Sequence, residues 1–540
     1  MRMARAVTRE FRFLVAALCI TAAFSACSDS EVVYRDREPF NQPADLATGF
    51  LGYYNVSTKQ TTCGNCHSGH QAEWQQTKHA RAYTSWNTAT KKDATCAACH
   101  SVTGNGNAAT GSVAGYAKVP DSTYKDVQCE SCHGAGLKHV EGVGKGTLIR
   151  PLAKLGVNGA GTCADCHSGT HQPFAEEWQQ SGHAKLDTAR ASNVSCAGCH
   201  EGRKALERWG VRGNYAEKAT PTAYISTTCS VCHDPHGSGN PAQLRFPVTA
   251  ADPEQNLCIK CHLNRAEPTT ARNTPHAPQG AMLLGFAGWR PPGFTYDTAR
   301  IFGTHATDKN PKLCAGCHVG RITVTDKLTG AFSFQATGHL MRPLPCLDAT
   351  GKPTSDKTCA YTEAARSWTT CTTSGCHGSA TAALNAFNTV RARMKFYSDQ
   401  LWKDIGTVGT LSAFPTDQGL LATLRQTRPG EWNSTDNIIT AAEGAEFNVR
   451  MCGEYSASNS DNSKGVHNPF LCEALLVSSI NYVKSFYALS GVSTQVLLAG
   501  PIGGPFNGAM RVSRTPTYRS VRVTPPTPSG TMSMLNSLPR

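Results

Sequence analysis

The most regular pattern of apolar positions lies in the last third of the chain. Its members are separated by three or four residues and are Leu384, Phe387, Val390, Met394, Tyr397 and Leu401. This spacing places them on one face of a helix, which we expect to pack against the rest of the protein. Asn468 and Pro469 are typical of an N-cap and a first helical position, and they predict a second helix from about Pro469 to Leu489.

The rest of the chain has no comparable helical pattern. The sequence contains 49 Gly and 29 Pro, which favour turns and loops. We therefore expect a mostly α-helical and irregular fold with little β-structure, in which short helices and loops precede a helical C-terminal part. After residue 26 no run of 18 apolar residues occurs, so no membrane-spanning helix is expected there.

A short motif of two cysteines followed by a histidine occurs nine times. Eight copies read Cys-x-x-Cys-His, and the ninth is two residues longer. In chain order, motifs 1 to 9 are Cys63/Cys66/His67, Cys96/Cys99/His100, Cys129/Cys132/His133, Cys163/Cys166/His167, Cys196/Cys199/His200, Cys229/Cys232/His233, Cys258/Cys261/His262, Cys314/Cys317/His318 and Cys371/Cys376/His377. Two thiols at this spacing can add to the vinyl groups of a haem, while the adjacent imidazole binds the iron. The sequence therefore predicts nine covalently attached haem c groups.

Zinc binding and disulfide formation are two simpler explanations of the paired cysteines. Pairs of Cys-x-x-Cys knuckles can build a tetrahedral zinc site, but such a site does not require a histidine directly after the second cysteine. Every pair here has one, which favours haem attachment. Motif 9 is the least typical, because its longer loop is also compatible with an ordinary surface turn.

Ten histidines lie outside the motifs, about one for each expected iron. They are His70, His79, His139, His171, His183, His236, His276, His305, His339 and His467. This supply indicates that all or nearly all haems have histidine on both sides, since the nine methionines occupy no recurring place. His70 and His171 compete for the last position. Coordination that is closed on both sides permits electron transfer and leaves no iron position for a substrate.

The motifs are evenly spaced and partly duplicated. The first cysteines of motifs 1 to 6 are 33 or 34 residues apart, and motifs 1 to 3 recur as motifs 4 to 6 after 100 residues. This pattern indicates duplicated trihaem units. We expect a signal peptide at 1–26, a lipidated linker at 27–60, trihaem units at 61–162, 163–257 and 258–378, a helical part at 379–489 and an irregular tail at 490–540.

The remaining cysteines and the net charge limit the chemistry further. Cys346 with Cys359, and Cys452 with Cys472, are expected to form disulfides in an oxidising compartment. The formal charge of +13 does not indicate a nucleic-acid partner, because no dense basic run occurs. Two propionates on each of nine haems would offset it with about 18 negative charges.

The first 26 residues have the features of an export signal. Four arginines precede an apolar run, Phe13–Phe24, that is too short to span a bilayer. The run ends before Cys27 in a sequence that resembles a bacterial lipobox, which implies a lipid anchor on Cys27. An ordinary signal peptide with a chance cysteine is the alternative. Ser28 favours the outer membrane, and export agrees with haem attachment, which takes place outside the cytoplasm.

Together these features resemble outer-membrane multihaem c-type cytochromes of the lipoprotein type. The resemblance rests on the regular motifs, on Trp-x-x-(Thr/Ser)-x-His at Trp74–His79 and Trp178–His183, on Cys-His-Asp-Pro-His at 232–236 and on Gly465–Pro469. It implies an electron carrier, and not an enzyme, at the periplasmic or cell-surface face of the outer membrane. The implied partners are other c-type cytochromes or a porin–cytochrome complex, and the implied acceptors are metal oxides, soluble metal ions or electrodes.

Two other functions stay open at this point. A multihaem reductase of nitrite, hydroxylamine or a sulfur oxyanion needs one iron with a free position, for which His67 and His377 mark the first candidates. A subunit of a cytochrome filament is compatible with the even spacing of the motifs. The abundance of histidine argues against the reductase, and the expected lipid anchor argues against the filament.

Overall fold

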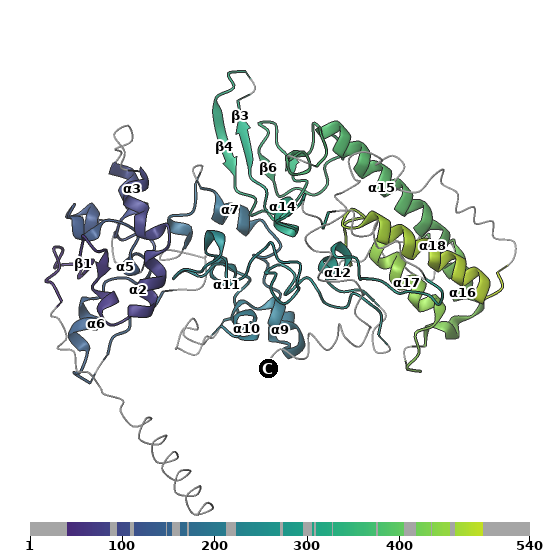
Figure 1. Cartoon of the computed structure of the whole chain (residues 1–540), viewed down its shortest axis with the longest axis horizontal. Helices are drawn as coiled ribbons and strands as arrows, with labels where there is room; N and C mark the ends of the chain where they lie inside the picture. Colours follow the sequence, from purple (N-terminus) through teal and green to yellow (C-terminus); the bar gives the residue numbers. More distant parts are fainter. Residues whose placement is uncertain are drawn as a thin grey trace, which may run out of the picture.

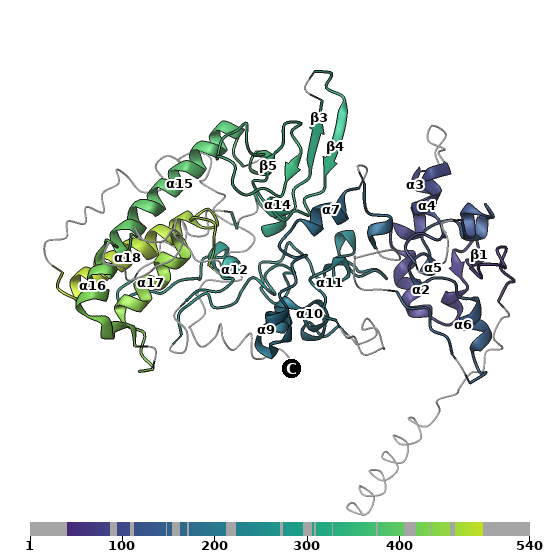
Figure 2. The same cartoon turned by 180° about the vertical axis from the view of Figure 1, so that it is seen from behind.

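The computed structural model describes residues 40–86, 94–107, 113–146, 148–153, 163–169, 172–211, 223–269, 274–294, 305–306, 309–326, 328–373, 376–403, 417–433, 435–453 and 460–489. The expected signal peptide, Cys27, His171 and the tail from residue 490 lie outside these ranges. The described part is elongated, with the N-terminal helices at one end and the C-terminal helices at the other (Figure 1). Figure 2 shows the same order from behind.

Short helices joined by loops form the first part of the molecule. The described α-helices are α2 (Ser68–Gln75), α3 (Ala82–Trp86), α4 (Ala97–His100), α5 (Cys129–His133), α6 (Leu137–Gly142), α7 (Phe174–Gln179), α8 (Thr188–Ser192), α9 (Val194–His200), α10 (Gly202–Arg208), α11 (Cys229–Cys232), α12 (Gln279–Leu283) and α14 (Cys314–His318). The longest of them, α2, has eight residues. Several contain a motif, because residues i, i+3 and i+4 share one face of a helix and the two cysteines and the histidine then point the same way.

Single turns of 3-10 helix connect these segments. They are η1 (Cys63–Asn65), η2 (His79–Arg81), η3 (Ala94–Cys96), η4 (Gly115–Ala117), η5 (Ser122–Tyr124), η6 (Cys163–Asp165), η8 (Pro241–Gln243), η9 (Thr369–Cys371) and η10 (Pro429–Trp432). Motifs 1, 4 and 9 begin in or at the end of such turns. The expectation of short helices and loops around the motifs is confirmed.

The described β-structure consists of three antiparallel strand pairs. β1 (Tyr53–Asn55) pairs with β2 (Gln60–Thr61), β3 (Ile322–Thr325) with β4 (Phe332–Ala336), and β5 (Cys346–Leu347) with β6 (Pro353–Thr354). The β3–β4 hairpin projects from the middle of the molecule (Figure 1). The predicted disulfide between Cys346 and Cys359 is present beside β5, with the two Cα atoms 6.0 Å apart.

Four helices, three of them longer than any described in the first part, form the C-terminal part. They are α15 (Ala380–Leu401), α16 (Leu420–Thr427), α17 (Ala441–Cys452) and α18 (Pro469–Phe486). The predicted stripe on α15 is buried at Val390, Met394, Tyr397 and Leu401. Asn468 caps α18 as predicted, since its side chain accepts a hydrogen bond from the backbone N–H of Leu471. Among the described helices, none is both long and apolar enough to cross a membrane.

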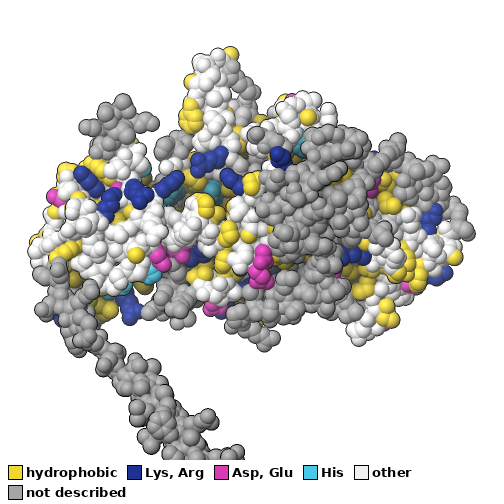
Figure 3. Space-filling model, in the orientation of Figure 1, with side chains coloured by type: hydrophobic (Ala, Val, Ile, Leu, Met, Phe, Trp, Pro, Cys, Tyr) yellow, Lys and Arg dark blue, Asp and Glu magenta, His cyan; other side chains and the backbone are white. Residues whose placement is uncertain are grey.

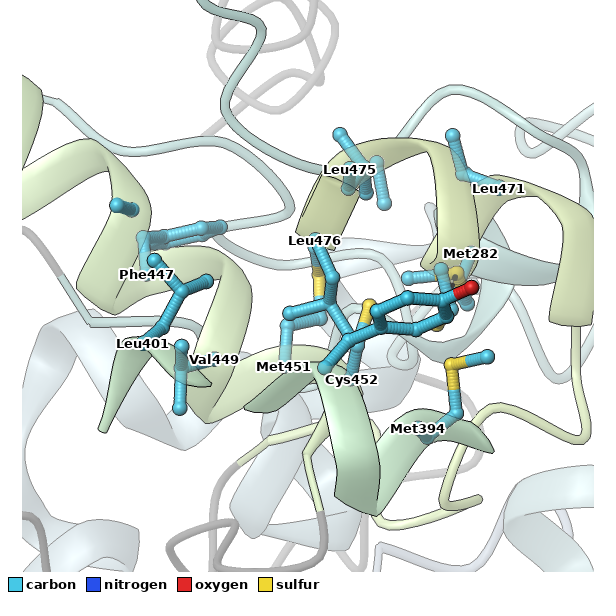
Figure 4. Packing of buried hydrophobic residues seen from close by; sticks show 14 of the residues in the cluster. Met282, Met394, Leu401, Phe447, Val449, Met451, Cys452, Leu471, Leu475 and Leu476 are labelled. Carbon is cyan, nitrogen blue, oxygen red and sulfur yellow. Dashed lines mark hydrogen bonds between the residues drawn. The ribbon is translucent and has the colours of Figure 1, made fainter. Parts of the chain in front are cut away.

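The largest apolar cluster joins these helices to the segment around α12. It includes Met282, Met394, Leu401, Phe447 and Leu475, all without exposed surface (Figure 4). A side chain at Gly444 would collide with the ring of Trp289, which lies against α17. Asn448 on α17 also accepts a hydrogen bond from the backbone N–H of Trp289 and donates one to its carbonyl oxygen, both at 2.8 Å. The helical part is therefore anchored to the region that contains motif 7.

The prediction of a disulfide between Cys452 and Cys472 is wrong. Both residues are free, buried thiols on α17 and α18, and they hydrogen-bond to each other. The Cys472 Sγ also contacts Met282 Sδ at 3.8 Å. The prediction paired the right two cysteines, but the packing of α17 against α18 brings them together without a covalent bond.

Candidate haem-binding sites

Eight motif histidines face a second histidine across a gap of nearly constant width. The ring centroids lie 6.1–6.5 Å apart in the pairs His67–His139, His79–His167, His133–His236, His183–His262, His200–His276, His233–His339, His305–His377 and His318–His467. In every pair, one member is a motif histidine and the other is a histidine predicted as a distal ligand. A metal bound by one nitrogen of each ring at roughly 2 Å places the centroids roughly 6 Å apart. Each gap therefore fits one iron.

Hydrogen bonds at Nδ1 of several of these histidines leave Nε2 as the nitrogen that can bind a metal. The Nδ1 atoms of His133, His139, His233, His305 and His318 lie 2.7–3.1 Å from backbone carbonyl oxygens. A carbonyl oxygen only accepts, so Nδ1 carries the hydrogen and Nε2 carries the lone pair. Metal-binding histidines in proteins are commonly oriented by such bonds.

Burial keeps most of the predicted distal histidines uncharged. It lowers the pKa to about 4 for His79, His183, His236, His305 and His339. Neutral imidazole is the form that binds a metal, and these side chains are neutral at pH 7. For His467, burial also lowers the pKa, but the attraction and hydrogen bond of Asp461 outweigh it and the pKa is raised.

A continuous cavity of about 4200 Å³ joins most of these gaps. The cysteines and histidines of motif 2 and of motifs 4 to 9 line it, as do the distal histidines His79, His183, His276, His305, His339 and His467. This volume is several times that of a usual ligand pocket, which holds about 300–1,000 Å³. The cavity can therefore hold several large groups in mutual contact.

The charges around the cavity suit an anionic cofactor. Fourteen Lys and Arg residues line it, against three Asp and Glu residues. Burial and the neighbouring Arg366 lower the pKa of one of them, Arg342, which an anion between the two cations would reverse. Figure 3 shows Lys and Arg side chains in a band across one face of the molecule, with histidine visible beside them. Haem propionates fit this surplus of positive charge.

Contacts between cysteines of different motifs order the sites in space. Thiols within hydrogen-bonding distance form the pairs Cys63–Cys129, Cys99–Cys166, Cys163–Cys229, Cys199–Cys261 and Cys258–Cys314. Three further pairs, Cys132 with Cys163, Cys232 with Cys258, and Cys317 with Cys371, are near enough to interact electrostatically. Together these interactions connect motifs 1, 3, 4, 6, 7, 8 and 9 in a line, with motif 2 beside motif 4 and motif 5 beside motif 7.

Cys66 does not have the surroundings expected of a haem-attachment residue. It is exposed at the end of η1, whereas Cys63 of the same motif is partly buried and lies within hydrogen-bonding distance of Cys129; neither cysteine lines the cavity. Cys132 and Cys163 are exposed as well, but both line the cavity. The physical reason is the place of motif 1 at one end of the line, where no other described motif covers its outer side. The role of Cys66 in haem attachment therefore stays a prediction from the motif spacing.

The contacts repeat with the duplicated sequence. Motif 1 touches motif 3 as motif 4 touches motif 6, and motif 2 touches motif 4 as motif 5 touches motif 7. The electrostatic interaction between cysteines of motifs 3 and 4 likewise recurs between motifs 6 and 7. Motifs 8 and 9, where the sequence intervals lengthen, continue the line with different contacts. The duplication is therefore one of arrangement as well as of sequence.

The predicted trihaem units, 61–162, 163–257 and 258–378, exchange histidines across their boundaries. The pairs His79–His167 and His133–His236 cross between the first two units, and the pairs His183–His262, His200–His276 and His233–His339 cross between the second and third. Each boundary is bridged in both directions. A single unit therefore does not contain the second histidine for all of its own motifs.

The duplicated Trp-x-x-(Thr/Ser)-x-His elements are fixed in the same way in both units. The indole N–H of Trp74 donates to the carbonyl of Val127 at 2.9 Å, and that of Trp178 donates to the carbonyl of Thr227 at 2.8 Å. Each carbonyl stands two residues before the third motif of its unit. Both rings are buried, so each tryptophan ties the helix before a predicted distal histidine to a haem motif.

His70 and His171 differ from the eight paired histidines. The ring of His70 lies 4.3 Å from that of His236, too close for a metal between them, and its side chain is exposed beside Glu73. His171 is outside the described residues. His100, the remaining motif histidine, has its Nδ1 2.8 Å from the carbonyl oxygen of Ala82, much as His133, His233 and His318 have theirs near other backbone carbonyls.

Residues that orient the ligands are the part of the site that the sequence did not predict. Glu177 on α7 accepts hydrogen bonds from the backbone N–H groups of Thr337 and His339 at 2.8 and 2.7 Å. Asp461 accepts one from His467 at 2.6 Å. Glu177 lies in the duplicated Glu-Trp-Gln-Gln element and could have been found there, whereas no sequence signal marks Asp461.

Within the described part of the chain, no group of three or more His, Cys, Asp or Glu side chains is arranged to hold a metal ion directly.

Two family models match the chain. Residues 62–134 match cytochrome c554 and c-prime, and residues 223–267 match the doubled CXXCH motif. The chain is a multihaem c-type cytochrome. This cytochrome binds haem c covalently and serves haem-based electron transfer. No curated protein and no solved structure matches it.

Proposed function

We propose that this cytochrome carries nine haems with histidine on both sides and conducts electrons at the outer membrane, towards extracellular acceptors or partner cytochromes. One observation supports the proposal above all. Eight motif histidines face a predicted distal histidine at 6.1–6.5 Å, and cysteines of neighbouring motifs lie close enough to interact from motif 1 to motif 9. Bound haem supplies a reversible one-electron change at each motif, so the order of contacts is the order in which electrons can move.

The protein residues have distinct roles in this proposal. The two cysteines of each motif attach the cofactor, and the paired histidines ligate the iron from both sides. Carbonyl groups orient the imidazoles of His133 and His305, and Glu177 fixes the backbone of His339. The basic residues around the cavity, Arg342 among them, neutralise propionates. With a histidine on each side, the protein would hold each iron closed to substrates, so it would conduct electrons without transforming a substrate there.

Support for nine haems comes from the motifs themselves. Motif 9 has the longer loop, yet its histidine, His377, faces His305 at 6.5 Å and its two cysteines line the same cavity as the regular motifs. His67 of motif 1 likewise faces His139 at 6.4 Å. His67 and His377 were the candidates for an iron with a free position, and each faces a second imidazole. This supports an electron carrier over a reductase.

Haem content and spin state test the proposal together. Intact-protein mass spectrometry of the mature holoprotein should give nine haem additions, and the paramagnetic resonance spectrum of the oxidised protein should contain low-spin signals alone. A Cys371→Ser/Cys376→Ser variant should lose one haem and no other. A high-spin signal of about one haem in the native protein, or a mass with fewer than nine additions, contradicts the proposal.

The location is tested separately. The lipobox-like sequence before Cys27 and the resemblance to outer-membrane cytochromes support an outer-membrane lipoprotein. Cells that produce the natural chain should yield it in the outer-membrane fraction, whereas Cys27→Ser should shift it to the soluble fraction with its haems attached. Protease treatment of intact cells then distinguishes the cell-surface face from the periplasmic face. Equal fractionation of both chains would overturn the anchor.

A further inference from the structure

His467 differs from the other paired histidines in the group that holds its Nδ1 atom. The Nδ1 of His467 lies 2.6 Å from Asp461 Oδ1, and the Asp461 side chain has 0 % exposed surface. Most of the other paired histidines with a hydrogen bond at Nδ1 use a neutral acceptor, such as Val466 for His305 at 2.7 Å. A carboxylate acceptor makes the imidazole a stronger electron donor to its metal.

The loop before α18 is built to hold this carboxylate in place. The hydroxyl of Ser463 donates to Asp461, and the Ser463 backbone N–H donates to it at 3.3 Å. Asn462 and Lys464 on either side of Ser463 have φ values of 57° and 56°. Two non-glycine residues in the left-handed region within one short loop are costly, and such strain gathers at functional positions.

Arg208 is a second unusual neighbour of a haem site. Its Nη1 lies 2.8 Å from Cys199 Sγ, the sulfur that becomes a thioether when the haem of motif 5 is attached. Gly198, inside the motif, makes room for it, because a Cβ there would stand 2.9 Å from the Arg208 Cδ. The first trihaem unit has Ala98 at the equivalent motif position and Ala108 in place of the arginine.

Asp461 and Arg208 lie at two different neighbours of motif 7, namely motif 8 and motif 5. Cys261 of that motif lies within hydrogen-bonding distance of Cys199 in motif 5, and Cys258 lies within that distance of Cys314 in motif 8. A stronger donor ligand stabilises ferric iron, whereas a nearby fixed positive charge stabilises the ferrous state, which has one more electron. The same electron is lost at one site and gained at the other, so no further reactant is needed.

We propose that Asp461 lowers the reduction potential at motif 8 through His467, and that Arg208 raises the potential at motif 5. Electrons that reach motif 7 are then driven away from motif 8 and towards motif 5. Asp461 and Arg208 are positioning and tuning residues in this scheme. The proposal rests on the haem ligation proposed above, and it adds a direction to a path that the contacts alone leave undirected.

The Asp461 arm is tested by a redox titration of the holoprotein, followed by absorption and paramagnetic resonance. Asp461→Asn keeps the shape of the side chain. We expect the part of the titration curve that belongs to one haem to move to higher potential, while the parts that belong to the other eight haems stay in place. The low-spin signal of that haem should change its g-values as well. Asp234→Asn is the matched control, because Asp234 stands 4.0 Å from His236 Nδ1 and is bound by Arg245 at 2.7 Å.

An unchanged titration of Asp461→Asn, or an equal shift in Asp234→Asn, overturns this arm. Mass spectrometry and spin state of the same samples separate the two levels of the argument. Missing haems or high-spin iron in the native protein refute the proposed ligation, whereas nine low-spin haems with unmoved potentials refute the tuning role alone.

The Arg208 arm uses the same titration with the charge removed or kept. Arg208→Gln should move the part of the titration curve that belongs to one haem to lower potential. Arg208→Lys keeps the positive charge, so its curve should lie close to the native one. Arg190→Gln is the control, because Arg190 lies near motif 5 but is half exposed and paired with Asp187 at 3.3 Å. An unchanged curve for Arg208→Gln, or an equal shift for Arg190→Gln, overturns the assignment.

Discussion

The haem-lined part and the C-terminal helical part of this cytochrome fill their interiors in different ways. Between residues 40 and 250 the described apolar clusters are small, as in the group of Phe50, Val102, Ala114 and Tyr124. In the helical part, α15, α17 and α18 bury a large apolar cluster against α12 (Figure 4). The haem-lined part has the wide cavity in its interior, between the cysteines and histidines of the motifs.

This difference indicates which interactions stabilise each part. The helical part gains stability from apolar side chains that leave water, at roughly 25 cal/mol per Å². The haem-lined part lacks enough of these contacts, and covalently attached porphyrins must supply the missing apolar surface. Its folding is therefore coupled to cofactor attachment, as in other small domains built around a metal group.

The largest effect should follow from the loss of one haem in the middle of the line. Cys229→Ser/Cys232→Ser removes the attachment at motif 6, between motifs 4 and 7. We expect a strong fall in thermal stability and rapid proteolysis within residues 163–257, because the interior of that unit loses its filling. Limited proteolysis with mass spectrometry locates the cuts.

Cys452→Ala/Cys472→Ala is the matched control for that variant. It also removes two cysteines, but from the side-chain core of the helical part, and all haems should stay attached. If the two double variants lose stability to the same extent, then the haem-lined part does not depend on its cofactors in the way proposed.

A cavity in the helical core should have a smaller effect that is confined to that part. Met394→Ala removes a fully buried side chain of α15 and should cost about 2–5 kcal/mol. Denaturant unfolding followed by far-ultraviolet circular dichroism measures the loss. The Soret spectrum should change only after the helices unfold; simultaneous loss of both signals would show that the two parts are one cooperative unit.

Loss of the indole hydrogen bond should have a still smaller effect on the haem-lined part. Trp178→Phe keeps an aromatic ring but leaves the Thr227 carbonyl without its donor, at a cost of about 1 kcal/mol. Trp74→Phe should cost a similar amount, since its bond to Val127 is equivalent. A thermal melt followed at the Soret band compares them. Clearly unequal losses would contradict the structural equivalence of the two units.

The last effect concerns pH and the boundary between the helical part and the haem-lined part. Burial raises the pKa of Glu267 from 4.5 to about 7, although Arg290 at 3.9 Å opposes the shift. The folded protein therefore holds this proton more tightly than the unfolded chain. The resulting stability is present below pH 4.5 and is lost as the pH rises through about 7.

Glu267→Gln should remove this dependence, because a neutral amide has no proton to lose. Melting temperatures at a series of pH values should fall less steeply for the variant than for the native chain over that window. Parallel curves would show that the pKa of Glu267 is the same in the folded and the unfolded protein.

Local features of the sequence predicted much of the fold and the chemistry of the site. The motif spacing indicated covalent haem, since the two thiols and the imidazole act within one turn of chain. Helix α15 followed from its apolar periodicity, and the start of α18 followed from Asn468 and Pro469, although α18 ends at Phe486, before the expected Leu489. These features depend on neighbours within a few residues, which is why the sequence alone sufficed.

The tertiary structure decided how distant segments meet. It gave motif 4 its facing histidine from His79 and motif 8 its facing histidine from His467, and it kept Cys452 and Cys472 as separate thiols. It also placed Asp461 behind His467 and Arg208 beside Cys199. Such choices depend on how separate helices and loops pack against one another, whether the residues are as close in sequence as Cys199 and Arg208 or as far apart as His318 and His467, and residue spacing carries no signal for this packing.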